Sequence, residues 1–103
     1  FYGARTRLDL FYLEELAAIA QKLPDFKFIP ALSHASDEDK WEGETGFVHE
    51  VVARHLRAEN FAGAIDAYAC GPTPMIDAML PVLQMNNVEP DHIYFDKFTP
   101  ATR

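Results

Sequence analysis

The amino-acid sequence predicts a small α/β domain built around a parallel sheet. Short apolar runs alternate with longer segments of helical period, and turn residues separate them, in the order strand, helix, strand, helix, strand, helix, strand. The chain has 103 residues, of which 49% are hydrophobic and 24% charged, as is ordinary for a globular protein. This length allows one domain with a single core, over residues 1–103.

A first helix is predicted after Thr6, because Thr6 and Asp9 stand at the spacing of a capping box. It follows a strand end at Phe1-Tyr2. A second strand is expected over residues 26–32, where Pro30 indicates an edge position because it cannot donate to a neighbouring strand. The helix residues expected to share one buried face are Leu16, Ile19, Ala20 and Leu23.

Residues 33–44 are polar and acidic and are predicted to form a loop. A second helix is expected to begin at Thr45 or Gly46 and to end at Asn60. A short apolar run over residues 64–69 predicts a third strand.

The third helix is expected to be capped by Thr73, with Pro74 at its first position and Pro81 bending or splitting it. It ends at Asn86-Asn87. A last strand is predicted over residues 93–95, before a polar tail.

Composition excludes several functional classes. Nine Lys and Arg against sixteen Asp and Glu give a net charge of −7, which lacks the basic footprint needed to bind nucleic acid or an anionic membrane surface. No apolar run is long enough to span a membrane. The lone cysteine excludes an internal disulfide and fits a reducing cytoplasm. Since the chain opens at Phe1 without Met, we expect it to be a piece of a longer protein.

In parallel α/β folds, ligands bind beyond the carboxyl ends of the strands. Three segments are therefore expected to gather there: residues 3–6, 33–44 and 70–73. Cys70-Gly71-Pro72 is the most informative, because a strand ends there and a helix amino terminus follows, which offers unpaired N–H groups to an anionic or amide-bearing ligand. The alternative is a buried, inert cysteine before an ordinary turn.

The stretch from Ala67 to Met75, with Cys70-Gly71-Pro72 at its centre, resembles the hallmark of the ferredoxin–NADP reductase superfamily. Other stretches agree with that family in order and spacing, and the ending Asp91 to Phe98 resembles the reductase components of bacterial phenol and related aromatic-ring monooxygenases. The stretches in agreement are Tyr2 to Thr6 with Asp9-Leu10 and Glu14 to Leu16, Ala31 to Ser33, Trp41 to Gly43 and Gly46 to Val48.

The resemblance implies a Rossmann-like three-layer fold and a flavin-dependent NADH reductase, of which residues 1–103 form part of the NAD-binding domain. It implies that Cys70 is catalytic, with its thiol beside the nicotinamide ring. It further implies that hydride passes from NADH to FAD, and that electrons pass through a 2Fe-2S cluster to an oxygenase component, the hydroxylase. The residues expected to bind cofactor are Gly3, Arg5, Ser33, Gly71, Pro72, Thr73 and Phe98.

Within the resemblance, Ser33 lies at the adenosine ribose, and Phe98 is the aromatic residue that stacks on the flavin. Members that use NADP follow the serine with arginine, whereas here His34 and the acidic run Asp37-Glu38-Asp39 follow it. Because carboxylates repel a 2′-phosphate, we expect NADH to be preferred over NADPH. The alternative is that the acidic run is merely a solvated loop.

The resemblance implies that the family's first strand and glycine-rich turn lie upstream of Phe1, and that the flavin and ferredoxin domains are also absent from residues 1–103. The sheet is therefore expected to show a gap, a rearranged pairing, or an interface such as a homodimer at the exposed edge. We expect this polypeptide alone not to catalyse hydride transfer.

No metal site is expected, because His49-Glu50-Val51-Val52-Ala53 lacks the second histidine of a zinc-protease motif. The alternative function is a non-catalytic nucleotide-sensing or interaction module.

Overall fold

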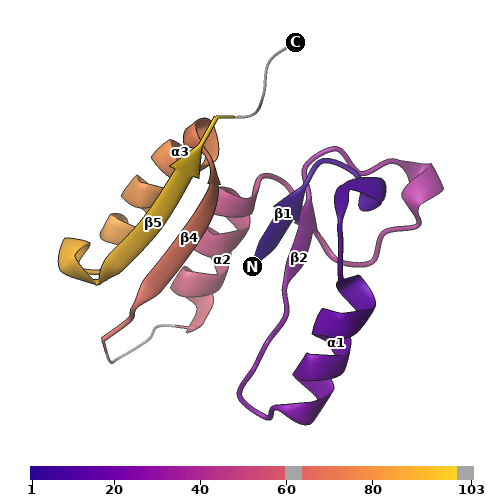
Figure 1. The fold of residues 1–103 in the computed structure, drawn as a ribbon, viewed down its shortest axis with the longest axis horizontal. Helices are drawn as coiled ribbons and strands as arrows, with labels where there is room; N and C mark the ends of the chain where they lie inside the picture. Colours follow the sequence, from indigo (N-terminus) through magenta and orange to yellow (C-terminus); the bar gives the residue numbers. More distant parts are fainter. Residues whose placement is uncertain (60–63, 100–103) are drawn as a thin grey trace. The chain divides into compact units, whose positions relative to one another are not determined.

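A computed structural model describes residues 1–59 and 64–99 and confirms the predicted α/β class (Figure 1). Every strand pair in these residues is parallel. The chain divides into two compact units, residues 1–51 and residues 52–103, and each is described by itself. The strands form two separate sheets, one in each unit, rather than one continuous sheet.

The first unit contains a three-stranded sheet in the order β1-β2-β3, formed by β1 (Tyr2–Ala4), β2 (Pro30–Leu32) and β3 (Glu44–Thr45). The expected edge position of Pro30 is wrong, because β2 is the middle strand. Proline is tolerated there because it is the first residue of the strand, where its missing N–H removes no interior bond. The remaining two residues of β2, Ala31 and Leu32, are completely buried.

The predicted capping box exists, but it caps a short 3-10 helix rather than an α-helix. The Thr6 backbone N–H and hydroxyl donate to Asp9 Oδ2 over 3.3 and 3.2 Å, which closes η1 (Arg7–Asp9). The α-helix α1 (Leu13–Lys22) begins later, after Tyr12 in the left-handed conformation at φ 62°. The expected buried face is also wrong, since no residue of α1 is buried in this structure.

The polar segment after β2 is more regular than the predicted loop. It contains the 3-10 helix η2 (Asp37–Asp39) and β3, which pairs with β2. Trp41 Nε1 donates to the carbonyl oxygen of Glu44 over 2.8 Å, which ties the turn to β3. The helix α2 (Val48–Glu59) starts two or three residues later than expected, and its predicted end at Asn60 lies outside the described residues.

The second unit contains β4 (Ala67–Pro72) paired with β5 (Ile93–Phe98), and α3 (Thr73–Met85) packs on both strands (Figure 1). A 3-10 helix, η3 (Pro90–His92), leads into β5. Both strands are longer at their carboxyl ends than predicted. The predicted split at Pro81 does not occur, because α3 continues through it as one helix. The buried residues around α3 are Ile76, Met79, Leu83, Val88 and Ile93.

Candidate functional site

The turn from β4 into α3 holds the predicted motif. Cys70 lies near the carboxyl end of β4, and its side chain is exposed, so the expectation of a buried cysteine is wrong. Gly71 is buried in the same strand. A Cβ atom on Gly71 would lie 2.8 Å from Met75 Sδ in the first turn of α3, so the flexible end of the Met75 side chain packs directly over this glycine.

The helix begins without a side-chain cap. Pro72 occupies the cap position with extended backbone angles, φ −58° and ψ 150°, and Thr73 is the first helical residue rather than the cap that was expected. No side chain among the described residues caps the amino terminus of α3. Its first-turn N–H groups and the positive end of the helix dipole are therefore available to a ligand beside Cys70.

The strand register places β5 residues beside this turn. Pro72 pairs with Phe98, and Cys70 pairs with Asp96. The Phe98 ring is 50% exposed, so the aromatic residue predicted to contact the flavin is accessible and adjacent to the Cys-Gly-Pro turn. Sequence reasoning placed Phe98 in a polar tail, and the pairing puts it at the end of β5.

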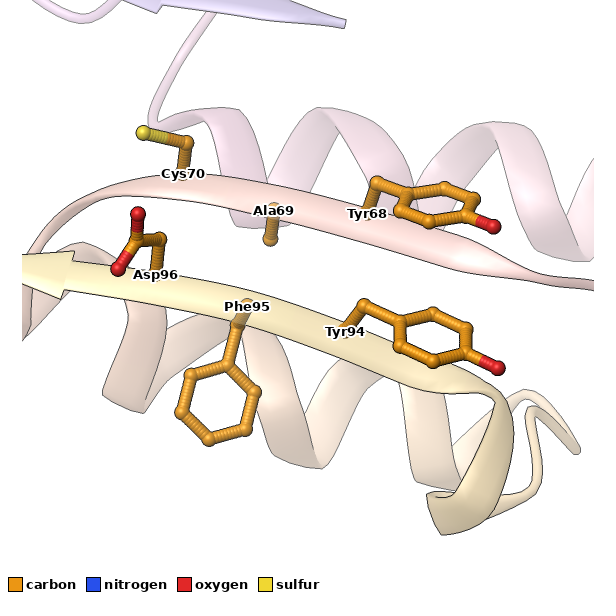
Figure 2. Close-up of a pocket in the computed structure, with 6 residues that line it drawn as sticks. All are labelled: Tyr68, Ala69, Cys70, Tyr94, Phe95 and Asp96. Atoms are coloured by element: carbon orange, nitrogen blue, oxygen red, sulfur yellow. The ribbon is translucent and has the colours of Figure 1, made fainter.

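An open hollow of about 350 Å³ lies along this strand pair (Figure 2). Figure 2 shows Tyr68, Cys70, Tyr94 and Asp96 projecting to one side of the strands and Phe95 to the other. The two tyrosine rings stack, with centroids 5.0 Å apart and planes at 15°. The hollow is lined by Tyr68, Ala69, Cys70, Tyr94, Phe95 and Asp96.

Sequence reasoning missed Tyr68, Tyr94 and Asp96. The period of two in a strand was a signal that could have found Tyr68, because it places this residue on the same face as Cys70. Asp96 could not be found in this way, because its place beside Cys70 depends on the register between two strands, which the spacing of residues along the chain does not define.

The first unit holds the other predicted residues. The Ser33 N–H donates to the Ala4 carbonyl over 2.9 Å, and the His34 N–H donates to the Arg5 carbonyl over 2.8 Å. These bonds extend the β1–β2 pairing and bring the predicted residues Arg5 and Ser33 to the same end of the sheet. The Arg5 side chain is exposed.

Gly3 has a packing role in this unit. A Cβ atom at Gly3 would lie 2.6 Å from the Cβ of Val48, the first residue of α2. This distance is too short for any two Cβ atoms, so only glycine allows β1 and the start of α2 to come this close.

The segment after Ser33 provides a second hollow, of about 480 Å³. The carboxylates of Asp37 and Glu38 are exposed in the same segment. The hollow is lined by Ala35, Ser36, Asp37, Lys40, Trp41 and Glu42.

The predicted site residues thus form two groups. Gly3, Arg5 and Ser33 lie in the first unit, and the Cys70–Thr73 turn with Phe98 lies in the second. Over residues 1–59 and 64–99, His, Cys, Asp and Glu side chains form no group of three or more that could hold a metal ion.

Residues 1–80 match the model of the oxidoreductase NAD-binding domain family. The chain belongs to this family. The propane 2-monooxygenase reductase component of Mycolicibacterium smegmatis is 42% identical over 102 residues, which cover 96% of this chain and 28% of that protein. The phenol 2-monooxygenase reductase component of Pseudomonas sp. is 37% identical over 101 residues, covering 98% of this chain and 28% of that protein.

Among solved structures, an Amycolatopsis cytochrome P450 reductase is similar with a TM-score of 0.79 and 29% identity. The match covers 97% of this NAD-binding chain and 28% of the reductase. The predicted resemblance to monooxygenase reductase components is therefore confirmed.

The chain spans 28% of the length of the curated relatives described above. None of the helices within the described residues has the length and apolar character that a membrane crossing requires.

Proposed function

We propose that this chain is the NADH-binding part of a flavin-dependent reductase that supplies electrons to an oxygenase component. The observation that carries the proposal is the uncapped α3 amino terminus beside the exposed Cys70, in a chain whose relatives are monooxygenase reductase components. When bound, NADH supplies a hydride, FAD accepts it, and a 2Fe-2S cluster carries single electrons onward.

The second unit fits the nicotinamide half of the dinucleotide. Cys70 is accessible to a ring lying in the hollow along β4 and β5, and we assign its thiol the catalytic contact with nicotinamide. The Cys70-Gly71-Pro72 turn and the first N–H groups of α3, which begins at Thr73, are donors for an amide or phosphate oxygen. Phe98 lies beside Pro72 in register, where its half-exposed ring offers the flavin an aromatic surface.

The first unit fits the adenosine half. Ser33 and Arg5 lie at the same end of the sheet. We assign the Ser33 hydroxyl to the ribose and the Arg5 cation to a phosphate. We place Gly3 at this end as well, where the close approach of β1 to α2 requires a residue without a side chain. Exposed Asp37 and Glu38 follow, and their charge disfavours a 2′-phosphate, so NADH is preferred over NADPH.

The remaining parts of the reductase lie outside this chain. We propose that a flavin domain, a ferredoxin domain and a further sheet strand complete residues 1–103, and that the whole protein is cytoplasmic. In the described residues, β1 pairs with β2 alone and β4 with β5 alone, so each has an edge that another strand can join. A second copy of the chain is the alternative occupant of such an edge. The chain by itself does not catalyse hydride transfer.

The visible absorption spectrum of the complete reductase, recorded before and after NADH is added, tests this function. We expect a flavin band that bleaches with NADH, and a slower bleaching with the same concentration of NADPH. A colourless protein that still binds NADH would replace the proposal with a nucleotide-sensing module. Turnover of NADH by this chain alone, with added flavin and an artificial acceptor, would contradict its assignment as an incomplete part.

A further inference from the structure

The carboxyl end of β5 carries Asp96, which lines the hollow, and Phe98, which we assign to the flavin, yet its own packing holds it weakly. Ile93, the first residue of β5, is buried, and the residues Tyr94–Phe98 that follow are all exposed. In the part of the chain that the structure describes, β5 pairs with β4 alone. The last pair of this ladder joins Phe98 to Pro72, which has no N–H to donate. Backbone pairing is therefore weakest where the proposed site needs a fixed strand.

An ion pair joins this end of β5 to α3. Lys97 Nζ lies 2.8 Å from Oδ1 of Asp77, which is in the second turn of α3. The register partner of Lys97 is Gly71, and a Cβ atom on Gly71 would point at Met75 in the same helix. Because register partners face the same side of a sheet, Lys97 lies on the α3 side of the strands.

The Lys97 ammonium group has a second contact on this side. It lies 5.6 Å from the centroid of the Phe95 ring, within the range of a cation–π interaction. Figure 2 shows Phe95 projecting away from the side on which Cys70 and Asp96 lie. Side chains alternate along a strand, so Asp96 and Phe98, the two neighbours of Lys97, face the side of the hollow. Lys97 is thus held on one side of the strand and its neighbours face the other.

We propose that the ion pair between Asp77 and Lys97 positions the nicotinamide site on the opposite side of the strands. By holding the end of β5 to α3, the pair keeps Asp96 level with Cys70. It also keeps the Phe98 ring at the Cys-Gly-Pro turn. In this role neither member of the pair contacts the coenzyme. The inference rests on the proposed function, in which nicotinamide lies in the hollow and Phe98 meets the flavin.

A direct effect of charge is the competing explanation, and the sign of the change separates the two. Loss of a hydride leaves the nicotinamide ring with a positive charge. If charge were the cause, removing the Lys97 cation would speed the transfer, whereas removing the Asp77 anion would slow it. If position is the cause, either removal frees the end of β5, and both slow the transfer.

The experiment follows flavin reduction by NADH in the complete reductase by stopped-flow absorbance. We expect Lys97→Gln and Asp77→Asn each to lower the limiting rate about threefold, the size of effect expected of one partly exposed ion pair. The dissociation constant of NADH should not change. The double variant should be no slower than either single variant, because the pair can be lost only once. Lys97→Arg keeps a cation that can reach the carboxylate and should keep the wild-type rate.

Hydrogen exchange of the backbone amides in residues 93–98 provides a measurement that does not depend on turnover. The exchange rate of these amides reports how often the end of β5 separates from β4. We expect faster exchange in Lys97→Gln and in Asp77→Asn, with the protection of α3 retained. A variant that was merely less stable would lose protection in both elements.

The opposite end of the same strand pair provides a matched control. His92 Nδ1 lies 2.6 Å from Oδ1 of Asp66, so this pair joins η3 to the residue before β4. The two side chains are 47% and 55% exposed, close to the 37% and 57% of Lys97 and Asp77. Asp66→Asn removes a comparable contact at the end of the strands away from the Cys-Gly-Pro turn. It should leave the limiting rate and the NADH affinity unchanged.

Unchanged limiting rates in Lys97→Gln and Asp77→Asn would overturn the inference, as would changes of opposite sign. An equal loss of rate in Asp66→Asn would also overturn it, because the rate would then follow general stability. A wild-type reductase whose flavin is not reduced by NADH would instead mean that the proposed function has failed. Normal reduction in the wild type and in both single variants leaves the function standing and removes only the role of the pair.

Discussion

Cys70 on β4 and Asp96 on β5 are register partners, and their side chains project to the same side of the strand pair (Figure 2). Both line the hollow in which we place the nicotinamide ring. Loss of a hydride leaves that ring with a positive charge, so a carboxylate at this position stabilises the product side of the reaction more than the reactant side. Substitutions of the thiol and of the carboxylate therefore test the proposed hydride transfer in two independent ways.

Asp96→Asn in the complete reductase is expected to slow flavin reduction by NADH roughly tenfold, because the neutral amide no longer stabilises the developing cation. Stopped-flow absorbance of the flavin, over a range of NADH concentrations, gives the limiting rate and the dissociation constant separately. Asp91→Asn is the control, since Asp91 is an exposed acid in η3 at the opposite end of β5. A change in NADH affinity with an unchanged limiting rate would refute this role for Asp96.

Cys70→Ala is expected to lower the limiting rate of flavin reduction more than it weakens NADH binding. In the proposed site the thiol lies against the ring at the reacting end, where a small error in orientation slows transfer without removing the contacts that hold the rest of the dinucleotide. The same stopped-flow measurement provides both values. Equal losses in rate and affinity, or no loss in either, would show that Cys70 has no catalytic role.

Gly3→Ala is expected to destabilise the protein by about 1–3 kcal/mol, because the new methyl group would overlap the Cβ of Val48. Urea unfolding followed by circular dichroism measures the change in the free energy of unfolding. Gly71→Ala is the matched control and should cost less, since its new Cβ would meet the flexible end of Met75, which can move away.

Val48→Gly should recover part of the stability lost in Gly3→Ala, since it removes the overlapping Cβ. If the two substitutions simply add, the close approach of β1 to α2 is not the reason for glycine at this position.

The stacked rings of Tyr68 and Tyr94 are expected to contribute a coupling of about 0.5–1.5 kcal/mol to the free energy of unfolding. A double-mutant cycle with Tyr68→Ala and Tyr94→Ala measures this coupling from urea unfolding curves. The corresponding phenylalanine variants keep the rings and should preserve stability. A coupling near zero in the cycle would mean that the rings lie side by side without stabilising the strand pair.

Several elements could be predicted from the sequence because their signals are local. The apolar run before Cys70, the glycine after it and the proline at the start of the helix identified the β4–α3 turn. The expected end of α3 at Asn86-Asn87 is confirmed: Asn86 caps the helix, and Asn87 adopts a positive φ of 69°. In each case neighbouring residues alone restrict the backbone.

Other predictions failed where distant contacts override local preference. The Thr6–Asp9 capping box formed as expected, but a capping box fixes only one turn, and the chain left the helical path before Leu13. Glu44-Thr45 carries no apolar pattern, and becomes a strand only because its backbone pairs with β2. Pro30 was expected at an edge, yet its place at the start of β2 lets the rest of that strand pair on both sides.

The sequence by itself determined the class of the fold, the order of its three α-helices and the position of the turn at Cys70-Gly71-Pro72. These depend on period, turn residues and side-chain type, which are properties of short segments. Only the tertiary structure paired Cys70 with Asp96 and Pro72 with Phe98, and fitted Gly3 against Val48. Those contacts join segments far apart in the chain. Strand register and close packing decide them, and both depend on two segments at once, so neither segment alone predicts the contact.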